Sequence, residues 1–231
     1  AIHNVLDSPA TYPVLMRKPW NRKMTGLLSV NNLHEFVVLV EQIINASLHK
    51  PTKIDGPAVL ALVGPSGSGK TATANSLCRD IRFVNPKTYC TKQSYKHRYM
   101  PEEKFNKQKF IEQTQYAGVK YGTKEEDIQA ILDENHFAVM PLDICGAIAL
   151  KRHFPTSIIF ISKDKETLIR DILDEDYSTD EKTLRILSID AEKRNREICD
   201  FVIDNGNGDA ADKIIELTVG DSDDYAGLFL M

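Results

Sequence analysis

At 231 residues, the chain is long enough for one well-buried domain and an extension. Its hydrophobic content of 42% and charged content of 27% are ordinary for a globular protein that folds in water. A net charge of −4 argues against a general binder of nucleic acids or anionic membranes, because such proteins usually carry a basic excess.

The first 55 residues differ in composition from the rest of the chain. Residues 8–25 hold three prolines among scattered basic residues, which predicts an irregular arm. Within 27–49, apolar residues recur on one helical face until Pro51 ends the pattern. They are Leu33, Phe36, Val37, Val40, Ile43 and Ile44. We therefore expect residues 1–55 to form an N-terminal extension with one amphipathic helix, which packs on the main domain or forms a homodimer or partner contact.

A phosphate-binding loop follows the first strand expected in the main domain. Residues 58–63 are an apolar run typical of a buried strand, and residues 64–71 read Gly-Pro-Ser-Gly-Ser-Gly-Lys-Thr, which matches G-x-x-x-x-G-K-[ST]. In such a loop backbone N–H groups surround a phosphate chain, Lys70 reaches the β- and γ-phosphates, and the Thr71 hydroxyl ligates Mg²⁺. A helix that begins at residue 70 adds a favourable dipole, so this segment predicts a nucleotide site.

From residue 57 onward, strand and helix signals alternate, which indicates an α/β fold with a mainly parallel sheet flanked by helices, of the P-loop NTPase type. Strands are expected at 58–63, 87–91, 137–142, 157–162 and 200–204, and helices at 70–81, 103–114, 123–135, 144–152, 164–174, 180–198 and 209–218. Capping boxes are predicted at Thr123 with Glu126 and at Ser178 with Glu181. The acidic tail, 220–231, is expected to be a solvated end.

Phosphoryl transfer also needs an acid near the metal and cations over the transferred group. Asp143 ends the apolar run 137–142, where the carboxyl ends of parallel strands meet a ligand; it serves the metal shell or caps the next helix. Arg170 and Arg185 lie on the helices that flank an acidic stretch, 174–181, which suits a moving lid. Isolated arginines are also common on surfaces.

The segment 88–123 is rich in Tyr, Lys, His and Arg, including Lys92, His97, Arg98 and Tyr99. Close basic and tyrosyl groups suit a second ligand that carries phosphate, or they form a solvated basic loop. RNA is the weaker interpretation, because the stretch is short and the whole chain is acidic.

From about residue 57 to 219, the chain resembles the guanylate kinases. The resemblance rests on an ordered set of motifs: the phosphate loop, Phe110-Ile111-Glu112, Tyr121-Gly122-Thr123, Leu142-Asp143-Ile144-Cys145-Gly146, the two arginines Arg170 and Arg185, and Phe201-Val202-Ile203-Asp204-Asn205. It implies a guanylate-kinase-like domain at 56–219, with an acceptor subdomain at about 88–123 and a lid at about 170–185.

The resemblance implies the reaction ATP + GMP → ADP + GDP with Mg²⁺. The acidic net charge and the lack of a long apolar stretch predict no partnership with nucleic acid or membrane. Glu112 would accept hydrogen bonds from guanine, Thr123 would contact the base carbonyl, and Tyr121 would bind the monophosphate. The implied ATP-binding residues are Gly64, Pro65, Ser66, Gly67, Ser68, Gly69, Lys70, Thr71, Thr73 and, on the adenine side, Asn205. The implied acceptor residues are Thr88, Lys92, Arg98, Tyr99, Glu112, Tyr121, Thr123 and Asp143. The implied catalytic residues are Lys70, Asp143, Arg170 and Arg185, with Mg²⁺ on Thr71 and, through water, on Asp143.

The chain also departs from the family pattern. Lys92 and Tyr95 stand where two acceptor-clamping arginines are expected, and lysine lacks the bidentate fork. Pro141 replaces an aspartate, Cys145 a glutamine, and Asp174 a lid arginine. Two alternatives therefore stay open: a catalytically weakened module that binds nucleotide or protein, and a kinase of another small phosphorylated acceptor.

The four cysteines are widely spaced and include no C-x-x-C pair, which favours reduced thiols over a zinc site or a disulfide framework. No apolar stretch reaches the roughly 18 residues of a membrane span, and no signal peptide is evident. We expect a cytoplasmic protein.

Overall fold

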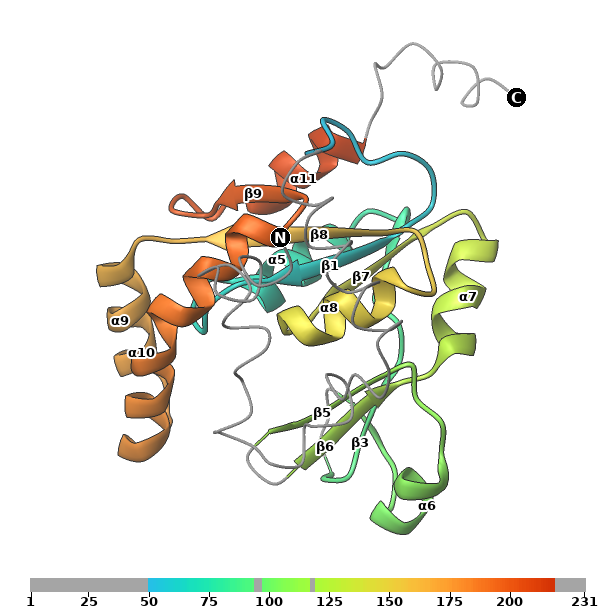
Figure 1. The fold of residues 1–231 in the computed structure, drawn as a ribbon, viewed down its shortest axis with the longest axis horizontal. Helices are drawn as coiled ribbons and strands as arrows, with labels where there is room; N and C mark the ends of the chain where they lie inside the picture. Colours follow the sequence, from blue (N-terminus) through green and yellow to red (C-terminus); the bar gives the residue numbers. More distant parts are fainter. Residues whose placement is uncertain (1–49, 94–96, 117–118, 219–231) are drawn as a thin grey trace, which may run out of the picture.

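The computed structural model describes residues 50–93, 97–116 and 119–218 (Figure 1). In this part of the chain, one sheet has five strands in the order β2-β7-β1-β8-β9, and a separate sheet has four in the order β4-β3-β6-β5. The predicted helix within 27–49 and the acidic tail lie outside the described residues. None of the described helices has the length and apolar character of a membrane-spanning segment.

The five-stranded sheet is parallel throughout, which confirms the predicted α/β class. Its strands are β1 (Val59–Val63), β2 (Phe83–Val84), β7 (Phe137–Pro141), β8 (Thr156–Ser162) and β9 (Phe201–Asp204). The two-residue strand β2 was not predicted, because so short a run carries no periodicity. Every residue of β1 is buried, as expected for a central parallel strand with both faces covered.

Helices cover both faces of this sheet (Figure 1). On one face, α5 (Lys70–Leu77) and α11 (Ala210–Thr218) pack their side chains against Leu60 and Leu62. On the other, α8 (Ile144–Lys151) packs against Ala61, and α7 (Glu125–Asp133) against Val59. Because alternate residues of β1 point to opposite faces, one apolar run serves both layers.

The second sheet lies below the first in Figure 1 and comes from the segment assigned to the acceptor. Its elements are β3 (Thr88–Cys90), β4 (Arg98–Tyr99), α6 (Glu102–Lys107), β5 (Glu112–Tyr116) and β6 (Val119–Thr123). The prediction of a helix over 103–114 was wrong beyond residue 107, and β4, β5 and β6 were missed. Beyond the end of α6, the ring of Phe110 packs on Phe105, at 4.3 Å between centroids.

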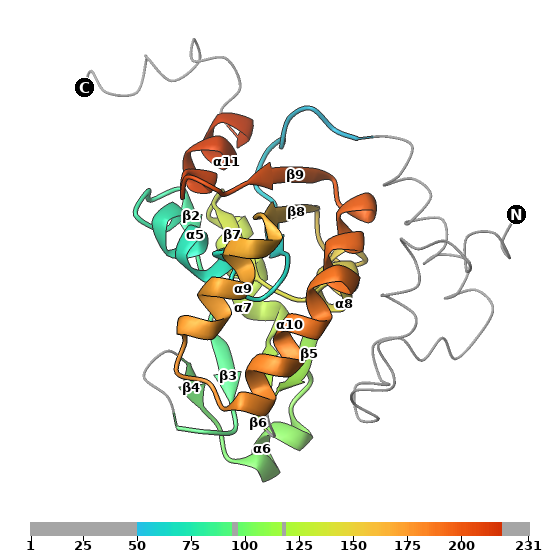
Figure 2. The ribbon, with the colours of Figure 1, turned by 90° about the vertical axis from the view of Figure 1, so that its left-hand side faces the viewer.

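Two helices, α9 (Lys165–Asp174) and α10 (Thr179–Arg194), form a pair at the side of the central sheet opposite α7 (Figures 1 and 2). They meet through Leu168, Ile172 and Ile189. The Ser178 cap is confirmed, since its hydroxyl accepts from the Glu181 N–H at 3.3 Å. The last turn of the predicted helix 180–198 is instead the 3₁₀ segment η2 (Asn195–Ile198).

The predicted capping box at Thr123 was wrong. Thr123 is the last residue of β6, and the N-cap of α7 is Lys124, whose side chain makes no capping bond. Pairing of Thr123 with both neighbouring strands fixes it in the sheet, which leaves its hydroxyl for another use.

Candidate functional site

The phosphate loop joins β1 to α5 and is built on glycines that no other residue could replace without strain. Gly64, Gly67 and Gly69 have φ angles of +146°, +82° and +91°. A Cβ on Gly64 would lie 2.5 Å from the carbonyl oxygen of Ile161. A Cβ on Gly69 would lie 2.5 Å from Nδ2 of Asn205. The loop therefore packs tightly between β8 and Asn205, the residue that follows β9.

Two cations lie on this loop. Lys70 Nζ donates to the carbonyl oxygens of Gly64, at 2.6 Å, and Pro65, at 2.8 Å, so its ammonium group already lies across the loop. Arg185, on α10, donates to Ser66 Oγ at 2.6 Å. The same guanidinium pairs with Glu181 at 2.8 Å and lies 4.0 Å from the ring centroid of Tyr177. Helix α10 thus contributes a positive charge to the phosphate loop.

The second lid arginine is placed differently. Arg170 is exposed, and within the described part of the chain it forms no hydrogen bond or ion pair. Its helix, α9, is nevertheless close to the loop: a Cβ placed on Gly67 would lie 3.6 Å from Cβ of Asp171. Asp174 is exposed at the end of the same helix. Arg170 would therefore need a movement of the lid to reach a nucleotide on the loop.

Asn205 holds the phosphate loop in place through hydrogen bonds of its side-chain amide. Its Nδ2 donates to the Ser68 carbonyl at 3.0 Å, and its Oδ1 accepts from the Ala210 N–H at 3.2 Å. The side chain is 7% exposed, so both ends of the amide are used by the protein itself. The resemblance places Asn205 beside adenine, whereas here it braces Ser68 and begins α11. Thr73, a further residue assigned to ATP, is buried in α5.

Three residues assigned to the acceptor, two of them to its base, form one row across the second sheet. Glu112 of β5 pairs with Thr123 of β6, and Thr123 pairs with Thr88 of β3. Residues directly opposite one another share a face, so their side chains lie together. Tyr121, two residues before Thr123, points to the same face, where it pairs with Cys90.

The other face of this sheet is its hydrophobic side. Phe110 packs on Phe105 and lies 6.1 Å from Tyr89, and Gly122 leaves room for it, since a Cβ there would lie 2.6 Å from the Phe110 ring. The middle glycine of Tyr-Gly-Thr is thus a packing requirement. The sequence motif therefore alternates residues on the face of Glu112 with one that faces the small hydrophobic core.

This register separates the basic residues assigned to the acceptor. Arg98 pairs with Tyr89, which places it on the hydrophobic side, whereas Tyr99 pairs with Cys90 and shares the side of Tyr121. Lys92 is exposed beyond the end of β3. His97 was named in the sequence only as part of the basic segment, yet its ring meets Tyr121 edge-on at 5.4 Å between centroids. This contact forms only in the folded chain, where the segment that leads into β4 lies beside β6.

Glu112 is the most perturbed acid of the site. It is 4% exposed, and burial, with a smaller contribution from the Asp143 charge, raises its pKa to about 8. Asp143 caps α8 by accepting from the Gly146 N–H at 2.9 Å. A Cβ on Gly146 would lie 3.1 Å from Cγ of Glu112, so α8 comes close to β5 at this point.

The Glu112–Thr123 pair places a buried carboxyl group beside an unsatisfied hydroxyl. Thr123 Oγ1 is buried with no hydrogen-bond partner in the part of the chain described, and the Glu112 side chain lies opposite it in the sheet. Buried polar groups are normally satisfied, so this pair is suited to a ligand that brings its own donors and acceptors. A flat base with adjacent N–H groups and a carbonyl has that pattern.

Comparison with known proteins identifies the family. A guanylate kinase family profile matches residues 57–219. The guanylate kinase of Wolinella succinogenes is 28% identical over 174 residues, which cover 68% of this chain and 81% of that protein. The guanylate kinase of Prochlorococcus marinus subsp. pastoris is 28% identical over 171 residues, covering 65% of this chain and 90% of that protein.

A solved structure shows the same fold. The crystal structure of guanylate kinase from Anaplasma phagocytophilum superposes with a TM-score of 0.53 at 20% identity, over 72% of this chain and 86% of that one. The family profile begins just before β1 and ends just after α11, so it includes both sheets and the helical pair. The chain therefore belongs to the guanylate kinase family of nucleoside monophosphate kinases.

Proposed function

We propose that this protein transfers the γ-phosphoryl group of ATP to GMP. The single observation that carries the acceptor assignment is the row of buried Glu112, buried Thr123 and half-buried Thr88, which offers a carboxyl group and hydroxyls to one flat ligand. Guanine presents two adjacent N–H donors and a carbonyl. Adenine lacks this pattern and would leave the buried carboxyl unpaired, a mismatch that sites of this kind reject strongly.

The phosphate loop would hold the donor. Its backbone N–H groups and Lys70 would bind the β- and γ-phosphates, and Arg185 would neutralise charge that builds up on the transferred group. Lys70 now lies on the carbonyls of Gly64 and Pro65, so it would exchange these contacts for phosphate oxygens. The loop thus keeps its lysine in place before the nucleotide arrives.

Magnesium fits the donor set at this site. Among the described residues, no group of three or more His, Cys, Asp or Glu side chains could hold a metal by itself. Mg²⁺ in phosphoryl-transfer enzymes usually takes one or two protein ligands and completes its shell with water and substrate phosphates. The Thr71 hydroxyl, and Asp143 through water, would supply that small protein share. Held there, the ion would supply positive charge to the phosphate groups.

The four thiols are consistent with a reducing compartment such as the cytoplasm. Cys78, Cys90, Cys145 and Cys199 are all free, and three of them are buried.

The direct test is ADP release with ATP and Mg²⁺ against GMP, dGMP, AMP, UMP, CMP and ribose 1,5-bisphosphate. We expect turnover with guanine nucleotides and little with AMP. A Glu112→Gln variant keeps the shape of the side chain but presents one acceptor in place of two, so its GMP turnover should fall while ATP binding persists.

Two other outcomes would redirect the assignment. Turnover with a different acceptor would keep the phosphoryl transfer and remove guanine from the site. Silence across the panel with intact ATP binding would support the binding-module alternative, which Lys92 and Asp174 favour because neither supplies the arginine expected there.

A further inference from the structure

The lid helix α10 carries an exposed apolar stripe. Leu184 and Leu187 are 48% and 67% exposed, and Ala191, also exposed, follows them at helical spacing. We call these three residues the outer stripe. The opposite side of the helix is occupied, since Ile189 is buried against α9 and Ile186 packs beside it. The described residues leave the outer stripe uncovered.

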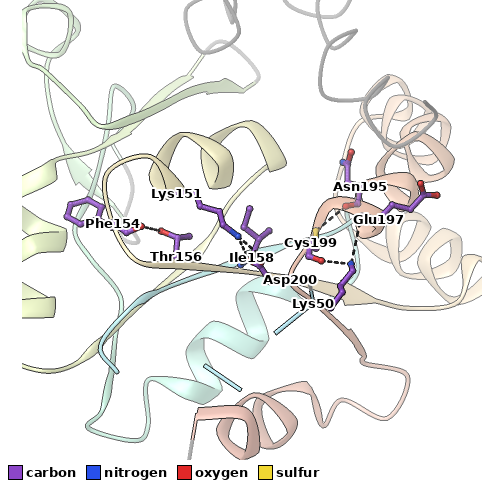
Figure 3. Close-up of polar contacts among 9 residues, drawn as sticks. All are labelled: Lys50, Lys151, Phe154, Thr156, Ile158, Asn195, Glu197, Cys199 and Asp200. Atoms are coloured by element: carbon purple, nitrogen blue, oxygen red, sulfur yellow. Dashed lines mark hydrogen bonds and ion pairs between the residues drawn. The ribbon is translucent and has the colours of Figure 1, made fainter. Parts of the chain in front are cut away.

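The chain enters the described structure at the carboxyl end of this same helix. Lys50 Nζ donates to the carbonyl oxygens of Cys199, at 2.6 Å, and Glu197, at 3.3 Å (Figure 3). Glu197 belongs to η2, which continues α10 directly. An ammonium group on the last carbonyls of a helical segment is favourable, so Lys50 acts as a fixed anchor. The residues before Lys50 therefore start from the end of α10.

The sequence before the anchor carries an apolar face of matching size. Its side chains are Leu33, Phe36, Val37, Val40, Ile43 and Ile44. The outer stripe runs over about 11 Å of helix, and residues 33–44 in helical form would extend about 17 Å. Six residues from Ile44 to Lys50 can reach about 20 Å. Leu187 lies only about 12 Å along the helix from Asn195, where η2 begins.

We propose that residues 33–44 pack their apolar side chains on the outer stripe of α10 in the same chain, as a strap that joins the N-terminal extension to the lid. An occupant on the same chain is favoured because a short connection gives an effective concentration on the order of millimolar, which a second copy does not reach at ordinary protein concentrations. The proposal does not depend on which acceptor the enzyme uses.

The strap would restrict the movement of α10 and would thereby affect the active site. Arg185 lies on this helix and contacts Ser66 of the phosphate loop. A strap on the outer side of α10 and this contact on its inner side would hold the helix from both sides. The position of the lid would then depend on residues that precede the kinase domain.

Hydrogen exchange on the full chain tests the strap. In the wild type, backbone amides of peptides that cover 33–44 should be protected. The double variant Leu184→Ser/Leu187→Ser should speed their exchange by about tenfold or more, because protection then depends on a docked state that has lost its contacts. Ile81→Ser is the matched control, since Ile81 is 82% exposed, follows α5 and lies far from α10 in the sequence. It should leave exchange of 33–44 unchanged.

A second variant tests the anchor at Lys50, and a mass measurement distinguishes a strap within one chain from a dimer. Lys50→Met removes the ammonium group but keeps the side-chain length, and it should also speed exchange of 33–44. Unchanged exchange of β1 and β8 peptides would show that each variant is folded. Unprotected amides at 33–44 in the wild type, or equal exchange in wild type and double variant, would overturn the proposal. Protection that rises with protein concentration, together with a dimer mass by light scattering, would overturn it in favour of a second copy.

Discussion

At the scale of single residues, the site depends on a carboxyl group that is neutral when no ligand is present. Burial raises the pKa of Glu112 to about 8, so at neutral pH the free enzyme holds a proton there. Guanine needs the ionised form, because its two N–H groups both donate. Binding should therefore release one proton from Glu112 at pH values below about 8.

This linkage predicts how GMP affinity depends on pH. Between pH 6.5 and 8, where the phosphate of GMP is already largely ionised, affinity should rise by up to about tenfold per pH unit and then level off. Calorimetry in buffers of different ionisation enthalpy should find close to one proton released per GMP at pH 7. Glu112→Gln should abolish the release. A slope that persists in this variant would place the titrating group elsewhere.

His97 supplies a second prediction at this scale. Its ring lies edge-on against Tyr121, at 5.4 Å, on the side of the sheet assigned to the acceptor phosphate. A hydrogen bond to a charged group contributes about 1.5–3 kcal/mol, so His97→Ala should raise the KM for GMP about 10- to 100-fold with little change in kcat. Arg98→Ala is the control, because the strand register turns Arg98 to the other side. Equal effects in the two variants, or a matching loss of guanosine affinity, would remove His97 from the phosphate contacts.

At the scale of elements, the lid pair makes contact with the phosphate loop through one arginine and not the other. Without nucleotide, Arg185→Ala should speed hydrogen exchange in α9 and α10, because it breaks the contact with Ser66. Arg170→Ala should not. With ATP and GMP, both variants should lose turnover, by about 100-fold for Arg185. A lid that exchanges equally in both variants would show that the Ser66 contact does not hold it.

The sequence predicts some elements better than others for physical reasons. The loop, β1, β7 and β8 follow from apolar runs and a glycine pattern, since buried parallel strands need nothing else. The acceptor sheet follows only in part. Strand β3 lies within the predicted strand 87–91, whereas β5 reads Glu-Gln-Thr-Gln-Tyr and β6 reads Val-Lys-Tyr-Gly-Thr, neither of which has an apolar period. Helix α6 ends at Lys107, and Phe110 beyond it packs back on Phe105.

The site residues divide in the same way. Lys70 and Asp143 can be placed from motifs that are local in sequence, because a strand end and a helix start determine their positions. The contact of His97 with Tyr121 and the bracing role of Asn205 depend on strands and loops that meet only in the folded chain. No spacing in the sequence reveals them.

At the scale of the whole molecule, an ion pair with a buried carboxylate joins three elements. Asp200 is 6% exposed and pairs with Lys151, at the end of α8, at 2.6 Å, while it also accepts from the Ile158 N–H of β8 at 2.8 Å (Figure 3). The pair lies beside Cys199, whose carbonyl anchors Lys50, so α8, β8 and the start of β9 are tied at one point.

Breaking this pair should lower the free energy of unfolding of the whole domain. Lys151→Met would leave the Asp200 carboxylate buried and without its cation, a change that costs about 3 kcal/mol of unfolding free energy in comparable sites. Part of the loss should be recovered by the double change Lys151→Met/Asp200→Asn, which removes the stranded charge. The control is Lys165→Met, because Lys165 pairs with Asp190 at the same 2.6 Å but both side chains are largely exposed. Exposed pairs contribute about 0–1 kcal/mol, so urea denaturation should separate the two variants clearly. Equal losses would mean that water reaches Asp200 and that the three elements are held together by their apolar contacts alone.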